Sequence, residues 1–204
     1  MTLPAKFVER VLRDLGGTEG AALCAALDAE PPVSVRLNPA KTGADTLPAG
    51  PDAGLPVPEA AGLPALAIAG RVPWSRDGAR ILDLCAAPGG KTTLYASLAG
   101  PDGLVVANEI DRRRASVLAD NVRKWGTGNV AVTTCEPRAL GDFEAWFDVV
   151  AVDAPCSGEG MFRKDPDARG EWSEGNVKQC AARQDEILRE AWRALKPGGT
   201  LVYS

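Results

Sequence analysis

Histidine is absent from the chain. Without an imidazole, the chain has no Ser-His-Asp triad, no histidine general base and no ligand set for most transition-metal sites. We therefore expect a functional site without a metal. If the site is catalytic, its proton transfers and nucleophilic steps depend on carboxylates, lysines or thiols.

Cysteine pairs and long apolar runs are also missing. The five cysteines are widely spaced, with no C-x-x-C motif, which argues against a disulfide framework or a structural zinc site and predicts a reducing, cytoplasmic environment. No apolar run approaches the roughly 20 residues of a membrane span, and the N-terminus lacks a secretory signal pattern, so we expect no membrane contact. The net charge of −4 does not indicate a nucleic-acid binder, so any such binding must depend on local basic clusters.

The pattern of apolar residues divides the chain into three parts. Residues 1–38 have helical spacing over 5–15 and 19–28 and alternate over 33–38, which predicts a small N-terminal helical and strand subdomain. Residues 39–79 are rich in Pro, Ala and Gly and are predicted to be a linker. Residues 80–204 alternate regularly between apolar strand patterns and helical patterns.

This alternation predicts an α/β fold with a parallel, doubly wound sheet and helices on both faces. Ligands of such sheets bind at the carboxyl ends of the strands. The expected strands are 81–84, 104–108, 130–134, 148–152 and 200–203; the expected helices are 91–99, 111–125 and 177–195, with a helical turn at 139–146 and a loop at 154–176.

The stretch from Ile81 to Thr93 has the sequence I-L-D-L-C-A-A-P-G-G-K-T-T. It predicts a buried strand, a tight turn and the start of a helix. Glycines at such a turn allow close approach of a ligand, and the helix N-terminus favours a negatively charged or electron-rich group. The alternative is an ordinary strand-to-helix turn.

Two nucleotide-binding motifs fit this stretch only in part. A P-loop would need glycine where Cys85 stands, although Gly90-Lys91-Thr92 is correctly placed. The G-x-G-x-x-G fingerprint is absent because the two glycines are adjacent. Asp83, the small-residue loop and the glycine pair are instead typical of proteins that hold S-adenosyl-L-methionine.

Three charged residues downstream are candidate cofactor contacts. Glu109 follows a strand about twenty residues after the glycine pair, as expected for a carboxylate that accepts hydrogen bonds from ribose hydroxyls; its alternative is an acid at a helix N-terminus. Glu136 could accept the adenine amino group or be a solvated loop acid. Arg114 could contact the cofactor or belong to a solvated basic turn with Arg112 and Arg113.

The segment D-A-P-C-S-G-E-G at residues 153–160 directly follows another predicted strand. Asp153 and Cys156 make it a candidate catalytic segment. Carbon 5 of a pyrimidine is a poor nucleophile, and a thiolate that adds to carbon 6 activates it. The alternative is that Cys156 is a small packed residue.

Residues 80–204 closely resemble the Sun-type (Fmu-like) RNA cytosine-5 methyltransferases, and the bacterial 16S rRNA branch in particular. The resemblance depends on D-L-C-A-A-P-G-G-K, A-N-E-I-D-R-R-R, F-D-V-V-A-V-D-A-P-C-S-G-E-G-M-F-R-K-D-P-D-A and L-K-P-G-G-T-L-V-Y-S, with S-V-R-L-N-P as a looser match. It implies a Rossmann-like S-adenosylmethionine-dependent methyltransferase fold. It also implies an enzyme that forms 5-methylcytosine in RNA, with ribosomal RNA as its partner.

The resemblance also implies roles for individual residues. Asp153 would contact both cofactor and cytosine, Cys156 would assist breakdown of the covalent adduct, and Arg163 and Lys164 would face the RNA backbone. Glu136 stands where family members often have Asp. The expected cofactor contacts are Cys85, Ala86, Ala87, Pro88, Gly89, Gly90, Lys91, Glu109, Arg114, Glu136 and Asp153.

The chain departs from the family pattern in three places. The attacking cysteine of the family follows the Tyr-Ser that ends this sequence, a segment before Arg80 is missing, and the last strands of the sheet and an RNA-binding module are absent. We therefore expect cofactor binding without turnover from residues 1–204. The alternatives are a non-catalytic S-adenosylmethionine- or RNA-binding module and a P-loop-like nucleotide hydrolase.

Overall fold

The computed structural model describes residues 2–29, 38, 41, 78–165 and 167–204. The strand expected at 33–38 and the linker expected at 39–79 therefore lie almost wholly outside the described residues. The described chain forms two compact units. The first contains residues 2–29, 156–165 and 167–182, and the second, the sheet unit, contains residues 38, 41, 78–155 and 183–204.

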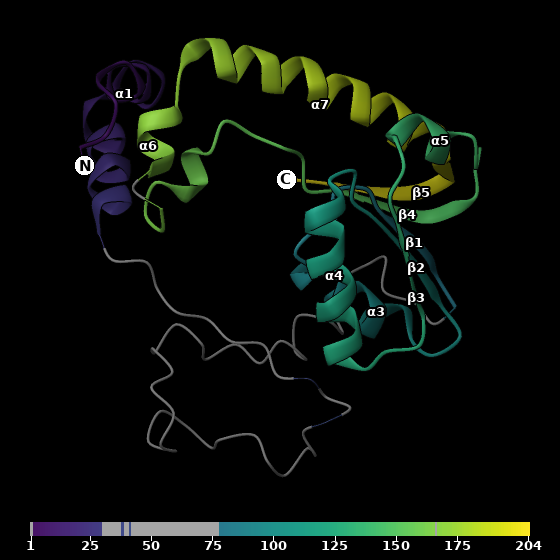
Figure 1. Cartoon of the computed structure of the whole chain (residues 1–204). Coiled ribbons are helices and arrows are strands. Elements are labelled where there is room, and N and C mark those ends of the chain that lie inside the picture. The colour runs from purple at the N-terminus through teal and green to yellow at the C-terminus, as the bar shows by residue number, and fades with distance from the viewer. Residues whose placement is uncertain (1, 30–37, 39–40, 42–77, 166) are drawn as a thin grey trace. The chain divides into compact units, whose positions relative to one another are not determined.

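A five-stranded sheet with strand order β3-β2-β1-β4-β5 forms the centre of the sheet unit. Every neighbouring pair is parallel, so all carboxyl ends lie at one edge (Figure 1). This confirms the expected α/β architecture. The strands are β1 (Arg80–Asp83), β2 (Leu104–Asn108), β3 (Val130–Thr133), β4 (Phe147–Val152) and β5 (Leu195–Tyr203).

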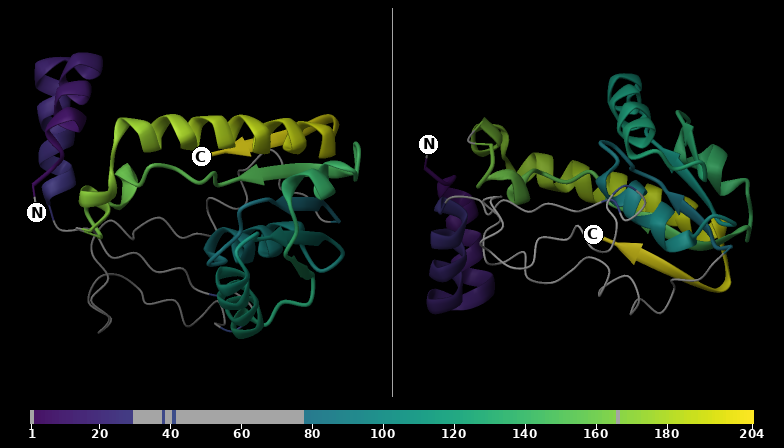
Figure 2. Two further views of the ribbon diagram at one scale, coloured as in Figure 1. Left: turned by 45° about the horizontal axis from the view of Figure 1, so that its top comes forward. Right: turned by 90° about the horizontal axis from the view of Figure 1, so that it is seen from below.

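Helices cover both faces of this sheet because the side chains of each buried strand alternate between the faces. On one face, α3 (Gly90–Ala99) and α4 (Arg112–Trp125) pack on residues such as Val105 and Ala107. On the other, α5 (Pro137–Gly141) and the C-terminal half of α7 (Glu174–Ala194) pack on residues such as Leu82 and Val150. Figure 2 shows the sheet from two further directions.

The last strand differs from the expectation. The sequence predicts that Lys196 to Gly199 ends the preceding helix and that a strand begins at Thr200, but β5 begins at Leu195, immediately after α7. Leu195 pairs with Phe147 and Thr200 with Val149, and the register shift between them accommodates the extra residues. Lys196 Nζ donates to Asp148 Oδ1 at 2.9 Å, which ties this irregular segment to β4.

The first unit contains α1 (Ala5–Asp28), the 3₁₀ turn η3 (Glu159–Met161) and α6 (Asp167–Glu171). α1 consists of two helices separated at Gly16, whose φ of 79° and ψ of 171° are not helical, so the two expected N-terminal helices are confirmed. The expectation of an element-free loop over 154–176 is wrong, because η3 and α6 lie in it. The aromatic core of the first unit explains why this segment forms short helices. Phe7 of α1 packs edge-on against Phe162 and Trp172, at ring-centroid distances of 5.1 and 5.7 Å.

Candidate functional site

Polar residues gather at the carboxyl ends of β1 to β4, which we call the strand-end edge. Asp83 ends β1, Glu109 follows β2, Glu136 comes three residues after β3, and Asp153 follows β4. Because the four strands are parallel and adjacent, these four acids share one edge of the sheet. The sequence-based expectation of a common edge is confirmed for the strand ends.

The loop after β1 brings main chain close to this edge. Gly89 has a φ of 108°, and a Cβ at this position would lie 3.0 Å from Leu118 Cδ1 of α4, so the turn requires glycine. Asn121 of α4 donates its side-chain N–H to the Pro88 carbonyl at 2.7 Å. Ala86 and Ala87 of the loop are buried and pack in a cluster with Leu118 and Val122 of α4. The loop is thus fixed to α4 rather than held only by its own turn.

Asp83 is almost completely buried and accepts a hydrogen bond of 2.7 Å from the Thr92 hydroxyl. Burial raises the pKa of Asp83 to about 6, although the Thr92 hydrogen bond opposes the shift. Burial, with the neighbouring charge of Asp83, raises the pKa of the Cys85 thiol to about 12. Cys85 therefore stays protonated at neutral pH and is suited to packing, not to nucleophilic attack.

Glu109 has one carboxylate oxygen without a hydrogen bond. Its side chain is 4% exposed, and Oε1 accepts the Asp111 N–H at 3.0 Å. Oε2 lies 3.2 Å from Arg114 Nη1, within ion-pair distance, but the geometry is not that of a hydrogen bond and this atom is buried without one. The Arg114 guanidinium offsets the charge of this buried oxygen but leaves its hydrogen-bonding capacity unused. Oε2 is therefore suited to accept a ligand hydroxyl.

Arg114 connects Glu109 with the loop after β1. Its Nη2 donates to the Ala87 carbonyl at 3.1 Å while Nη1 faces Glu109. The main-chain N–H of Arg114 is bound by the Asp111 carboxylate, which caps the N-terminus of α4. The side chain is thus directed at two expected cofactor contacts, and it is not a solvated basic turn residue alone.

Asp153, Lys91 and Ser204 form a polar triangle at the ends of β4 and β5. Lys91 Nζ lies 2.7 Å from Asp153 Oδ1 and donates to Ser204 Oγ at 3.1 Å, and that hydroxyl donates to Asp153 Oδ1 at 3.1 Å. Both charged side chains are about half exposed, at 46% and 48%, so the ion pair orients them with little gain in stability. Asp153 therefore stays accessible to a ligand.

The roles of the remaining expected site residues, Glu136, Cys156, Arg163 and Lys164, stay predictions. Glu136 is exposed at the N-terminus of α5, without a capping hydrogen bond from its side chain. Cys156 is exposed and, with Arg163 and Lys164, belongs to the first unit, so its role stays a prediction. Among the described residues no cluster of His, Cys, Asp and Glu could hold a metal ion, and no helix is long and apolar enough to cross a membrane.

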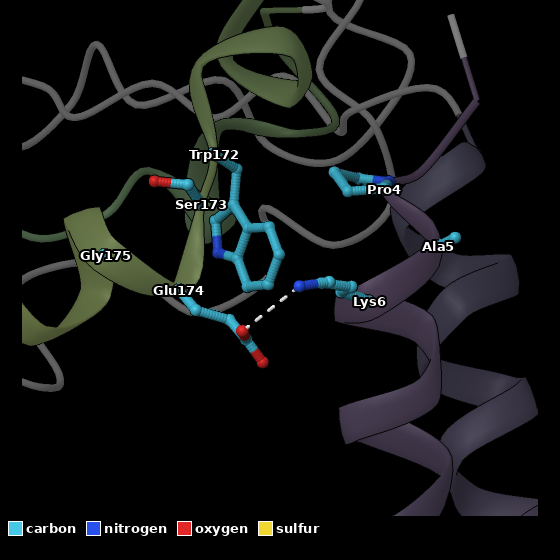
Figure 3. Close-up of a pocket in the computed structure, with 7 residues that line it drawn as sticks. All are labelled: Pro4, Ala5, Lys6, Trp172, Ser173, Glu174 and Gly175. Atoms are coloured by element: carbon cyan, nitrogen blue, oxygen red, sulfur yellow. Dashed lines mark hydrogen bonds and ion pairs between the residues drawn. The ribbon is translucent and has the colours of Figure 1, made fainter.

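Two hollows lie outside the triangle of Lys91, Asp153 and Ser204. One, of about 410 Å³ in the sheet unit, lies between the loop after β1 and the C-terminal part of α4, and includes Pro88, Gly89 and Lys124 in its wall. The other, of about 390 Å³ in the first unit, is lined by Trp172 and by the Lys6–Glu174 ion pair (Figure 3). The second contains none of the residues expected to bind a ligand.

Sequence reasoning missed two residues at the strand-end edge. Thr92 donates to buried Asp83, and Asn108, only 1% exposed, ends β2 with its side chain hydrogen-bonded to neighbouring strand ends. The signal for Asn108 was an amide that closes an otherwise apolar strand. Such a residue must find partners when it is buried.

Comparison with known proteins identifies the family of residues 74–204. A family model described as 16S rRNA methyltransferase RsmB/F matches residues 74–204. Ribosomal RNA small subunit methyltransferase F of Escherichia coli O7:K1 and its namesake from Shigella boydii serotype 18 are each 46% identical over 126 residues, 61% of this chain. The chain spans about a quarter (26%) of the length of these relatives.

Solved structures show the same fold. PH0851 is 35% identical with a TM-score of 0.62, over 68% of this chain and 32% of that one. NSun6 from Pyrococcus horikoshii, solved with SFG, is 30% identical with a TM-score of 0.57, over 69% of this chain and 36% of that one. The parallel sheet and its covering helices thus form a Rossmann-like methyltransferase fold. The chain belongs to the 16S rRNA methyltransferase RsmB/F family.

Proposed function

We propose that the sheet unit binds S-adenosyl-L-methionine at the strand-end edge, as part of an enzyme that forms 5-methylcytosine in small-subunit ribosomal RNA. The observation on which the proposal depends is Glu109 Oε2, a buried acceptor without a hydrogen bond. A ribose hydroxyl is a donor that would satisfy it. The family and the names of its relatives support the choice of cofactor and RNA.

Different residues of the chain would contact different parts of this cofactor. Glu109 would accept the ribose hydroxyls, and Arg114 would hold both Glu109 and the Ala87 carbonyl in place. The main chain from Cys85 to Lys91 would approach the methionine part, as the glycine turn permits. Glu136 would accept the adenine amino group. Bound there, the cofactor supplies an electrophilic methyl group.

Two residues are proposed to act on the target base. Asp153, half exposed and oriented by Lys91 and Ser204, would hold the cytosine through a hydrogen bond. Cys156, exposed in the segment after β4, would assist release of a covalently bound base after methyl transfer. Arg163 and Lys164 would contact the phosphates of the RNA. The base must be single-stranded or flipped out of its helix to reach these groups.

A P-loop-like hydrolase is the less favoured function because of the contacts of Thr92. In a P-loop the hydroxyl after the lysine binds magnesium, whereas the Thr92 hydroxyl donates to buried Asp83 at 2.7 Å. Lys91 is likewise paired with Asp153. Both side chains that would define a phosphate site are thus engaged within the protein.

Ligand preference and methyl transfer together test the proposal. Equilibrium titration should show binding of S-adenosylmethionine and no comparable binding of ATP with magnesium. A protein that joins this chain to the remaining segments of its family should transfer labelled methyl groups to small-subunit rRNA and yield 5-methylcytosine on nucleoside analysis, and Asp153→Ala should reduce this yield strongly. Preference for ATP, or a labelled product other than 5-methylcytosine, would refute the proposal.

A further inference from the structure

We propose that Asn108 is the positioning residue of the cofactor site, and that it sets the preference for adenine by fixing the turn that presents Glu136. The inference rests on the proposed function, because it assumes a cofactor with an adenine ring at the strand-end edge. The amide of Asn108 is buried and hydrogen-bonded within the protein. Its proposed action passes through the segments to which it is hydrogen-bonded.

The side chain of Asn108 joins the ends of β1 and β3 to β2. Its Nδ2 donates to the Cys135 carbonyl at 3.0 Å and to the Leu84 carbonyl at 3.4 Å. Its Oδ1 accepts the Thr133 hydroxyl at 3.0 Å, the Cys135 N–H at 3.1 Å and the Cys135 thiol at 3.3 Å. Both donors and the acceptor of the amide are therefore used.

The main chain around Asn108 extends the same connection. The Asn108 carbonyl accepts the Ala86 N–H at 2.9 Å, and the Glu109 N–H donates to the Thr133 carbonyl at 3.1 Å. Segments from three strand ends thus meet at this residue. They are the start of the loop after β1, the ribose-binding candidate Glu109, and Cys135, which directly precedes Glu136.

Glu136 depends on this arrangement more than the other candidates do. It is exposed, and its side chain makes no capping hydrogen bond to α5. Cys135, immediately before it, is held by Asn108 through its N–H, its carbonyl and its thiol. Without the Asn108 amide, Cys135 would lose all three of these hydrogen bonds, and the side chain of Glu136 would no longer be held in one orientation.

Only an amide satisfies all of these partners. The Leu84 and Cys135 carbonyls need a donor, whereas the Thr133 hydroxyl and the Cys135 N–H need an acceptor. An aspartate has the same shape but sets its carboxylate against two carbonyl oxygens. Asn108→Asp is therefore an almost isosteric change that breaks the contacts on the Nδ2 side.

Nucleoside selectivity separates positioning from simple loss of stability. We would titrate the chain with S-adenosylhomocysteine and with S-inosylhomocysteine, whose ring has a carbonyl in place of the amino group that Glu136 would accept. The unmutated chain should prefer the adenine ligand. Asn108→Asp should reduce its affinity by at least about tenfold and lower the preference to the value of a Glu136→Ala variant. Adding Asn108→Asp to Glu136→Ala should lower the preference no further.

Asn129 supplies the matched control. Its Nδ2 also donates to two carbonyls, those of Ala96 and Gly100, at 2.9 and 2.8 Å, but it precedes β3 at the opposite end of the sheet. Asn129→Asp should cost stability and leave the ratio of the two affinities unchanged. Asn108→Ser, which removes both amide donors without adding charge, makes the same test if Asn108→Asp does not fold.

The outcomes distinguish this inference from the proposed function. Failure of the unmutated chain to bind either ligand would refute the proposed function and the role of Asn108 with it. Binding without preference between the ligands, or the same preference in the Asn108 variants as in the unmutated chain, would overturn the role of Asn108 and leave cofactor binding intact.

Discussion

Two buried acids at the strand-end edge, Asp83 and Glu109, differ in their hydrogen-bond partners. Asp83 accepts a hydrogen bond from the Thr92 hydroxyl, which lowers its pKa, but burial outweighs this effect and raises the pKa to about 6. Glu109 is also buried, and its Oε2 faces Arg114 Nη1 at 3.2 Å without a hydrogen bond. We infer that Asp83 stabilises the start of α3 through Thr92, whereas the unbonded oxygen of Glu109 accepts a hydrogen bond from a ligand. This difference is invisible in the sequence, where both are acids that end apolar runs.

Replacing Asp83 by Asn should change the pH dependence of stability. The folded protein binds a proton at Asp83 below about pH 6, whereas the unfolded chain binds it only below the ordinary aspartate pKa of 3.8. The free energy of unfolding should therefore fall as pH rises from about 4 to 6, by at most about 3 kcal/mol for this residue. Asp83→Asn should lack this part of the slope in urea unfolding measured from pH 4 to pH 7.

Exposed Asp120 on α4 provides the comparison for Asp83. Asp120→Asn removes one carboxylate without removing a buried charge, so its stability profile should follow that of the unmutated protein between pH 4 and pH 7. Parallel profiles for all three proteins would show that Asp83 does not titrate in this range. The assigned pKa would then be wrong.

At the scale of elements, the turn from β1 into α3 depends on Gly89, the first of two adjacent glycines. Gly89→Ala should lower the free energy of unfolding by about 1–3 kcal/mol, because the φ of 108° disfavours a side chain and the new Cβ would meet Leu118 at 3.0 Å. It should also weaken cofactor binding. Urea unfolding and titration with S-adenosylmethionine measure the two effects.

Gly90 is the matched control, one residue further along. A Cβ there meets no atom within 4 Å, and the position is the first of α3, where alanine is a better helix former than glycine. Gly90→Ala should therefore be at least as stable as the unmutated protein. If both substitutions cost the same free energy, the glycine pair is required for another reason than the backbone of Gly89.

Elements that depend on local pattern were predictable, and those that depend on distant partners were not. The buried runs of β1, β2 and β4 and the capped helix α4 follow from apolar spacing and Asp111. The start of β5 at Leu195 depends on pairing with Phe147, and η3 and α6 depend on the aromatic core around Phe7. Neither partner is near in sequence.

The same distinction applies to the site. Glu109 and Asp153 could be predicted because their positions after apolar strands follow from the parallel topology. For Asn108 the sequence shows only an amide at the end of an apolar strand; its partners Leu84 and Cys135 lie 24 and 27 residues away and cannot be assigned without the strand order. Oε2 of Glu109 likewise becomes significant only when its burial is known.

At the scale of the whole molecule, the two compact units should respond separately to core mutations. Phe7→Ala removes a ring that packs on Phe162 and Trp172 and should cost the first unit about 3–5 kcal/mol. Hydrogen exchange should accelerate in α1 and in residues 159–172. The affinity of the sheet unit for S-adenosylmethionine should stay within about twofold.

Phe143 offers a control in the sheet unit, because its side chain is 51% exposed. Phe143→Ala should leave hydrogen exchange in α1 unchanged and cost less than Phe7→Ala. If Phe7→Ala lowered the free energy of cofactor binding by as much as the free energy of unfolding, the two units would be energetically coupled, and this prediction would be wrong.

The most direct test of the cofactor site is calorimetric titration of the chain with S-adenosylmethionine, in the unmutated form and as Glu109→Ala, Asp153→Ala and Glu144→Ala. Glu144 is an exposed acid just before β4, at the opposite end of the sheet, and serves as the control. We predict binding that Glu109→Ala and Asp153→Ala each weaken by at least about tenfold and that Glu144→Ala does not change. Equal affinity in all four proteins would contradict the placement of the cofactor at the strand-end edge.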